Sequence, residues 1–316
     1  MSIFMQGGKS SLIKTMYYCI IIATIFIFIP ISNSHAAKMI QMTFASPDKA
    51  FGMLITAVKS GDAGQLAAIF GPAVKDIFPT DKETTAKARE RFLKAYNEKH
   101  RLENLEINKV VLHVGDNDWP WPVPVVKVGN RWRFDTKAGV KEIIARRIGK
   151  NEISAVQVCL AYVDSQLEYA PEHRVKGIGE YAQYLASDPD KKNGLCWDSK
   201  DEEKPSLLGP MVAGACKTEM KRMIRQYSPY HGYYYKILKS QGKDALGGAY
   251  NYVVDGRMIG GFALVAYPAV YGSSGITTFI VNKDGIIYQK DLGNDTEKIA
   301  ESMDSYNPDS SWKKMD

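Results

Sequence analysis

The residues that most often mark a catalytic or metal site are scarce in this sequence. It has four cysteines and five histidines among 316 residues, and no two histidines have the i, i+4 spacing with which a helix holds zinc. Neither a complete phosphate-binding loop nor a Gly-x-Ser-x-Gly nucleophile motif is present. These absences argue against metal, nucleotide and serine-hydrolase chemistry. They favour a non-enzymatic role that uses no cofactor.

The sequence also lacks a long continuous run of residues with the same charge. The sequence has 41 Lys and Arg against 35 Asp and Glu, a net charge of +6, spread along the chain. A nucleic-acid-binding domain concentrates basic residues on one face or in one run, so we expect no nucleic-acid partner. With 45% hydrophobic residues, the composition is that of an ordinary globular protein.

Long apolar runs are confined to the N-terminus, where residues 1–36 have the features of an export signal. Lys9 and Lys14 precede the apolar run 16–31, and small residues lie just before Ala37. Cleavage there would leave a periplasmic or secreted protein. The alternative is an uncleaved anchor, because a run of this length falls just short of a membrane span. Membrane contact is expected only through such an anchor.

The cysteines leave two interpretations open. Cys19 would be removed with the signal, while Cys196 and Cys216 flank a loop-rich stretch and could form a disulfide in an oxidising compartment. Cys159 lies on an apolar helical face. The alternative is that all three remaining cysteines are buried or free thiols.

The order of predicted elements indicates an α+β fold with two domains, residues 37–149 and 150–316. In the first domain, Ser46 and Pro47 are typical of a helix start, and a second helix is expected near residues 83–100. Strands are predicted at residues 109–114, 121–128 and 131–134, with a tight turn at Gly129 and Asn130.

Helical periodicity continues through residues 137–169, but Gly149 interrupts it. A glycine costs about 1 kcal/mol in a helix interior, so we expect a break or kink near residues 149–151 and place the domain boundary there. A further helical piece is expected at residues 178–186. The second domain then forms an antiparallel sheet, with hairpin turns predicted at Asp255-Gly256 and Asp284-Gly285.

Five residues are candidates for binding. Trp119 and Trp121 alternate with prolines in an extended segment, and they could either form an aromatic binding edge or cap the core of the first domain. His231 follows Tyr230 in a tyrosine-rich run, which could contact a ligand or form a structural cluster. Tyr271 opens a glycine-flanked loop that could take part in recognition.

Several segments together resemble a bacterial family of exported proteins known as domain of unknown function 2950. The resemblance implies export and a shared fold, but no activity, because the family has none assigned. The matching segments are residues 118–120, 132–136, 144–149, 161–163, 230–233, 251–254 and 260–266.

Two further resemblances concern the separate domains. The first resembles cone-shaped domains of the NTF2-like or cystatin-like type, in which a sheet wraps around a helix and either encloses a pocket or is filled by side chains. The second, a helix followed by a sheet with a late Asp-Gly turn, is similar to the heads of type IV pilins and type II secretion pseudopilins. It lacks their long N-terminal assembly helix.

Two functions follow as hypotheses. The favoured one is a non-enzymatic envelope protein that binds another envelope or surface protein, or has a structural role, through its pilin-head-like domain. The alternative is a small-ligand binder or unassigned hydrolase that uses a pocket in the N-terminal domain.

Overall fold

The computed structural model describes residues 41–78, 82–188, 193–196 and 229–315, all within one compact unit, residues 41–316. The predicted export signal lies outside the described residues, so its cleavage stays a prediction. Among helices in the described ranges, none combines the length and apolar character needed to cross a membrane. The fold is α+β, as the sequence predicts.

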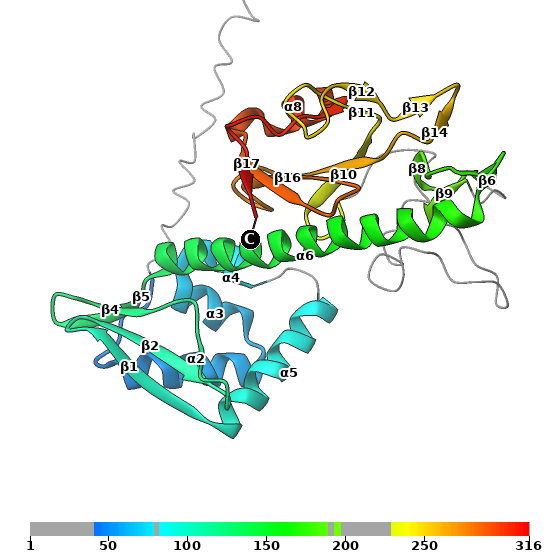
Figure 1. Cartoon of the computed structure of the whole chain (residues 1–316). Helices are drawn as coiled ribbons and strands as arrows, with labels where there is room; N and C mark the ends of the chain where they lie inside the picture. The colour runs from blue at the N-terminus through cyan, green and yellow to red at the C-terminus, as the bar shows by residue number, and fades with distance from the viewer. Residues whose placement is uncertain (1–40, 79–81, 189–192, 197–228, 316) are drawn as a thin grey trace, which may run out of the picture. The chain divides into compact units, whose positions relative to one another are not determined.

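Helices come first along the chain, and an antiparallel sheet follows them (Figure 1). The helical elements are α2 (Pro47–Ser60), α3 (Ala63–Phe70), η2 (Gly71–Ala73), α4 (Val74–Ile77) and α5 (Lys82–Glu98). The strands are β1 (His100–Glu106), β2 (Lys109–Val114), β3 (Trp119–Pro120), β4 (Val125–Val128) and β5 (Arg131–Phe134). The sheet order is β1-β2-β4-β5, and β3 pairs with β2.

Local sequence explains how α2 begins and ends. The Ser46 hydroxyl accepts a hydrogen bond from the Lys49 amide at 3.3 Å, and Pro47 occupies the first turn. Gly61 ends the helix in the left-handed conformation, with φ 69°. The apolar face of α2 is buried in a first hydrophobic core together with Phe70 and Phe134.

The turn between β4 and β5 is also encoded locally. Val128 pairs with Arg131, which leaves a two-residue loop. Gly129 has φ 61° at its first position, the position that a type II′ turn reserves for glycine. The predicted hairpin is therefore confirmed.

Helix α6 (Thr136–Glu172) is continuous over 37 residues, about 55 Å at 1.5 Å per residue. The Asp135 carboxylate caps it by accepting a hydrogen bond from the Ala138 amide at 3.1 Å. The predicted break at Gly149 is wrong, because Gly149 lies within the helix. Packing of both ends of α6 offsets the local cost of one glycine. The predicted domain boundary thus falls inside a helix.

The two ends of α6 belong to different hydrophobic cores. Near its start, Gly139 packs against Val123 of the first core. Farther along, Ala155, Cys159 and Tyr162 are buried in a second core beneath the C-terminal sheet, and α6 contacts β15 and β16 there (Figure 1). One helix therefore supports both cores.

The C-terminal sheet is antiparallel, with strand order β10-β15-β16-β17-β19. Its members are β10 (Tyr233–Leu238), β15 (Ala263–Pro268), β16 (Thr277–Asn282), β17 (Ile287–Asp291) and β19 (Lys313–Lys314). The remaining elements are β6 (Arg174–Val175), β7 (Ile178–Gly179), β8 (Tyr184–Ala186), β9 (Gly194–Cys196), β11 (Ser240–Gln241), β12 (Tyr250–Asn251), β13 (Val253–Val254), β14 (Arg257–Met258), η3 (Gly293–Asp295), α8 (Thr296–Ser302) and β18 (Ser305–Tyr306).

Both predicted hairpin turns of this half are present. Asp255 and Gly256 have φ 50° and 75° between β13 and β14, which is the requirement of a type I′ turn. Gly285, with φ 71°, lies between β16 and β17.

The helix expected at residues 178–186 is wrong, because β7 and β8 occupy that stretch. Gly179 explains part of the difference. A Cβ at this position would lie 2.9 Å from the Ala170 carbonyl oxygen of α6, so the glycine permits a close backbone approach. A periodicity-based prediction cannot detect such an approach.

Replacing Gly149 with alanine should stabilise the protein. An added Cβ meets nothing within 4 Å, so Gly149→Ala is expected to raise the free energy of unfolding by about 0.5–1 kcal/mol. Gly139→Ala is the matched control in the same helix, because its methyl would lie 2.5 Å from a Val123 carbon and should destabilise. Urea denaturation measures both. A shift of both variants in the same direction would contradict the continuous, packed helix.

Candidate ligand-binding pocket

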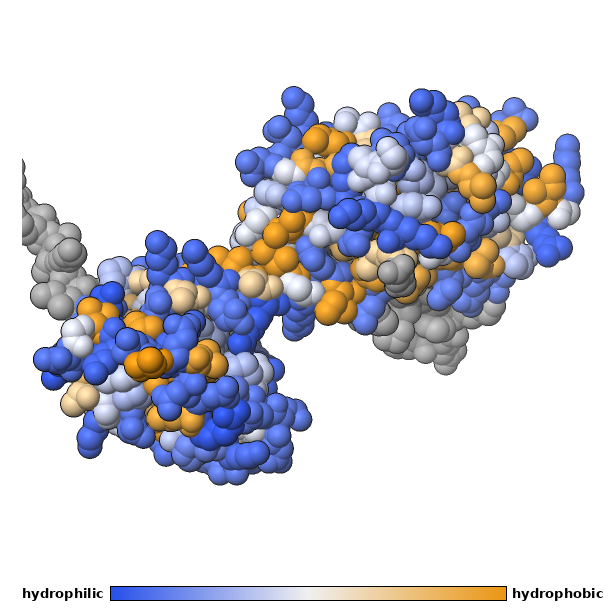
Figure 2. Space-filling view, turned by 60° about the vertical axis from the view of Figure 1, so that its left-hand side comes forward, coloured by the Kyte–Doolittle hydropathy of each residue, from blue (hydrophilic) through white to orange (hydrophobic). Residues whose placement is uncertain are grey.

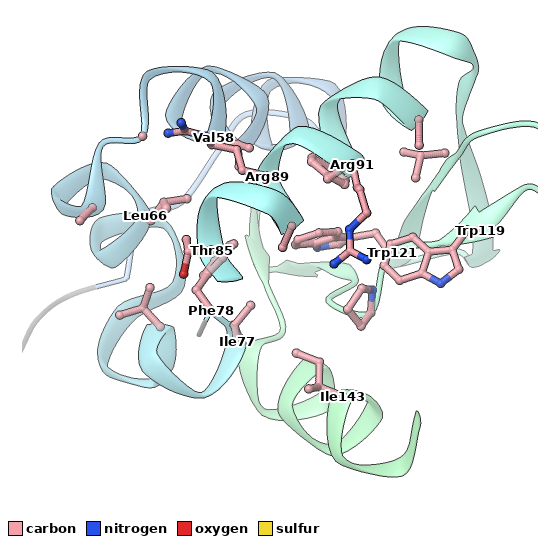
Figure 3. Close-up of a pocket in the computed structure, with 18 of the residues that line it drawn as sticks. Val58, Leu66, Ile77, Phe78, Thr85, Arg89, Arg91, Trp119, Trp121 and Ile143 are labelled. Carbon is pink, nitrogen blue, oxygen red and sulfur yellow. The ribbon is translucent and has the colours of Figure 1, made fainter. Parts of the chain in front are cut away.

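A cavity of about 980 Å³ opens in the N-terminal half of the described chain. Its walls come from the four helices α2 to α5, from the end of the first sheet and from the start of α6 (Figure 3). The lining residues are Val58, Gly61, Ala63, Leu66, Val74, Lys75, Ile77, Phe78, Thr85, Ala88, Arg89, Arg91, Phe92, Ala95, Val114, Trp119, Trp121, Pro122, Ile143 and Arg146.

Helix α5 leaves space open where its inward face carries the short side chains of Ala88 and Ala95. Ala88, Phe92 and Ala95 recur at helical spacing and line the cavity. They are only partly buried, whereas the inward face of α2 is fully buried. Alanine cannot reach across to the sheet, so α5 does not fill the space beside these two positions.

An aromatic wall closes one side of the pocket. Trp121 is 9% exposed and lies 4.8 Å from Phe92 between ring centroids. Trp119 is 43% exposed and meets Trp121 edge to face at 6.3 Å. Figure 3 shows both indoles on the side opposite Leu66, and the Phe78 ring lies 6.4 Å from Trp121 between centroids. Trp121 thus packs in the first core and both tryptophans line a cavity, while their role in binding stays a prediction.

Backbone pairing fixes the tryptophan segment. The Trp121 amide donates to the Leu112 carbonyl at 2.7 Å, and Trp119 pairs with Val114 in the sheet. Arg146 of α6 donates to the Pro120 carbonyl at 2.8 Å, and its guanidinium lies 5.1 Å from the centre of the Trp119 ring. This cation–π contact orients the more exposed indole.

The indole nitrogen of Trp121 is a polar atom in the pocket wall without a partner. Among the described residues, none accepts a hydrogen bond from this buried Nε1. An unsatisfied buried donor costs about 1–3 kcal/mol. A ligand acceptor that reaches this nitrogen would recover that cost.

A charged network holds the residue that precedes Trp119. Asp118 has a left-handed backbone, with φ 52°, and its carbonyl lies 2.8 Å from Nδ1 of His113. Arg101 donates to both carboxylate oxygens of Asp118 and, at 2.7 Å, to Glu103. The hydrogen bonds and positive charge of Arg101 lower the pKa of Asp118 below its ordinary value.

This network predicts an acid-dependent contribution to stability. Because the folded-state pKa of Asp118 is lowered, its ionised form stabilises the fold above the unfolded value of 3.8, and the contribution is lost as the pH falls through the folded value. Asp118→Asn removes this titration while tolerating the left-handed backbone. The stability gap between wild type and variant should be largest near neutral pH and should close below 3.8. Urea denaturation across pH tests this, and a gap independent of pH would refute it.

Cations gather at the pocket without matching carboxylates. Lys75, Arg89, Arg91 and Arg146 line it, and no Asp or Glu does so among the described residues. Arg146 is already engaged by Glu142 at 2.7 Å. Sequence reasoning missed Arg89 and Arg91, because charged residues on an amphipathic helix usually mark its solvated face.

The structure divides the sequence-predicted site residues into two groups. Trp119 and Trp121 line the pocket, whereas Tyr230, His231 and Tyr271 lie at one end of the C-terminal sheet. Their ligand-binding role stays a prediction. The Tyr230 and His231 rings are in contact, with centroids 4.2 Å apart. The Tyr271 hydroxyl donates to Asp291 at 3.1 Å, and this hydrogen bond raises the Tyr271 pKa.

The loop that contains Tyr271 is held against the middle of α6. Arg147 donates to the Ser273 carbonyl at 3.0 Å, and Asn151 donates to the Ser274 carbonyl at 2.8 Å. A Glu152 oxygen accepts from the amides of Ile276 and Thr277 at 3.0 Å. The loop is therefore tied to the helix by side chains that contact its middle and its C-terminal end.

The cysteines differ in state. Cys196 is disulfide-bonded, while Cys216 lies outside the described residues, so their pairing with each other stays a prediction. Cys159 is a buried free thiol, and burial raises its pKa to about 12, which disfavours the reactive thiolate. Within the described ranges, no group of three His, Cys, Asp or Glu side chains could hold a metal ion.

The chain belongs to a family described as a protein of unknown function (DUF2950), whose model matches residues 41–315. This confirms the resemblance seen in the sequence, and it assigns no activity. No curated protein and no solved structure matches the chain significantly. The likenesses of the two halves to cone-shaped domains and to pilin heads therefore stay predictions.

Proposed function

We propose that this protein binds an apolar small molecule in the pocket of its N-terminal half. The supporting observation is the 980 Å³ cavity with its largely apolar wall. Protein interiors normally pack densely, and an unfilled cavity of this kind costs stability. Ligand sites commonly enclose about 300–1,000 Å³ and are lined by apolar and aromatic side chains. The volume of this cavity and the residues that line it both agree with that description.

The wall chemistry favours binding over hydrolysis. Among the described lining residues, Thr85 carries the single hydroxyl, and there is no serine, cysteine, histidine or carboxylate. General acid–base catalysis needs a side chain that exchanges a proton near neutral pH. Three of the four charged lining residues are arginines, and arginine is not deprotonated in proteins. The pocket is thus better suited to holding a molecule than to cleaving one.

Partner binding through the C-terminal sheet has less support. On the face shown in Figure 2, apolar residues are scattered among hydrophilic ones, which is ordinary for a soluble surface. The binding of another envelope or surface protein stays a prediction from the sequence. The pocket is the more specific feature.

Ligand binding can be tested with the neutral fluorescent probe N-phenyl-1-naphthylamine. We expect saturable binding with enhanced emission. Ala88→Trp places an indole in the cavity and should weaken binding by more than about tenfold, because it occupies the site. Ala86→Trp is the matched control, since Ala86 is exposed on the same helix and does not line the pocket.

Two outcomes would overturn the proposed function. One is the absence of saturable probe binding by the wild type. The other is equal binding by Ala88→Trp and Ala86→Trp when both variants retain cooperative thermal unfolding.

We also propose that the protein acts outside the cytoplasm. The disulfide at Cys196 supports an oxidising compartment, in agreement with the signal-like residues 1–36. When the full chain is expressed in a Gram-negative bacterium, the periplasmic fraction should contain a protein that begins at Ala37. A peptide linking Cys196 to Cys216 should appear in non-reduced digests. Recovery of full-length, fully reduced protein from the cytoplasm would contradict both expectations.

A further inference from the structure

The charged residues that line the described part of the pocket are all positive. Four of its described lining residues are cationic and none is acidic, although the whole chain is nearly balanced, with 41 basic and 35 acidic residues. A cavity with apolar walls and cations of one sign attracts a negatively charged group, because the low-dielectric walls strengthen its field.

Arg89 and Arg91 are placed to act on a ligand. At about 100° per residue, they flank the stripe of Ala88, Phe92 and Ala95, one on each side, at the margin of the pocket. Both side chains are exposed. Gly61 leaves room for one of them, because a Cβ at Gly61 would collide with the guanidinium of Arg89.

Among the described residues, these two guanidinium groups have no protein partner, unlike several other arginines. Arg131 donates to Thr43, and Arg257 pairs with Glu180 at 3.1 Å. Arg146 has both Glu142 and the Pro120 carbonyl as partners. No hydrogen bond or ion pair joins Arg89 or Arg91 to another side chain or backbone group in the part of the chain that the structure describes. Their donors are free for a ligand.

We infer that the ligand is a fatty acid, with its chain in the apolar cavity and its carboxylate held at the margin by Arg89 or Arg91, which lie on opposite sides of the stripe. This inference rests on the proposed function. A planar guanidinium donates two parallel hydrogen bonds to a carboxylate, which makes arginine suited to this head group. The cavity supplies the hydrophobic contribution of the chain, which grows with each methylene that it buries. The exposed head group keeps its charge in contact with water.

Displacement of N-phenyl-1-naphthylamine separates the contribution of the apolar chain from that of the charged head group. Dodecanoate and 1-dodecanol share a chain length and differ in charge. At pH 8 and low salt, below the concentration at which dodecanoate forms micelles, dodecanoate should bind roughly tenfold more tightly, the effect expected of one charge-assisted contact. This ratio should shrink at 0.5 M salt, because exposed charges are screened. The affinity of the alcohol should change little.

Substitutions of the arginines test which residues contact the carboxylate head group. Arg89→Gln with Arg91→Gln should reduce the dodecanoate preference to about threefold or less while leaving probe and dodecanol affinity intact. Lys94→Gln with Lys141→Gln removes the same charge from exposed positions outside the pocket and should preserve the preference. Unchanged probe binding shows that each variant retains the pocket, and the single variants Arg89→Gln and Arg91→Gln replace any double variant that loses it.

The possible failures are distinguishable. If the wild type binds the probe but binds dodecanoate no better than dodecanol, the fatty-acid inference is wrong and the proposed function stands. A preference for dodecyl phosphate over dodecanoate would also overturn the assignment of a carboxylate. An equal loss of preference in both double variants would mean that net charge, rather than these arginines, is responsible. Failure to bind the probe at all overturns the proposed function itself.

Discussion

The continuity of α6 is the constraint on which the rest of the fold depends. Its first turns pack against Val123 beside the first sheet, and its second half is buried beneath β15 and β16. A long helix is stabilised mainly by tertiary packing of its apolar face rather than by intrinsic propensity. Each core therefore supports a helix on which the other core also depends. The pocket lies beside the segment where Ile143 and Arg146 project from this helix.

Much of the fold could be predicted from local sequence because its signals are short-range. The cap at Ser46 and the turns at Gly129 and Asp255-Gly256 each depend on one or two residues and their backbone requirements. Gly149 shows where such reasoning fails. Its helix penalty is real, but packing at distant points along α6 outweighs it. Gly179 likewise depends on a tertiary contact that has no local signature.

The candidate site was only half predictable. Trp119 and Trp121 stand out because prolines and large aromatics rarely alternate, and both line the pocket. An unfilled interior, however, depends on distances between elements, which periodicity does not report. Ala88 and Ala95 fit a packed helix and a cavity wall equally well. Arg89 and Arg91 looked like solvated charges, and only their position at the pocket distinguishes them.

The contacts along the middle of α6 also have a mechanical consequence. Ile143 and Arg146 line the pocket, and within two further turns Arg147, Asn151 and Glu152 hold the loop at residues 270–277. A straight helix transmits rotation about its axis to every side chain it carries. Any adjustment of α6 that a bound molecule imposes at Arg146 would therefore strain the hydrogen bonds to Ser273 and Ser274 unless the helix bends between them.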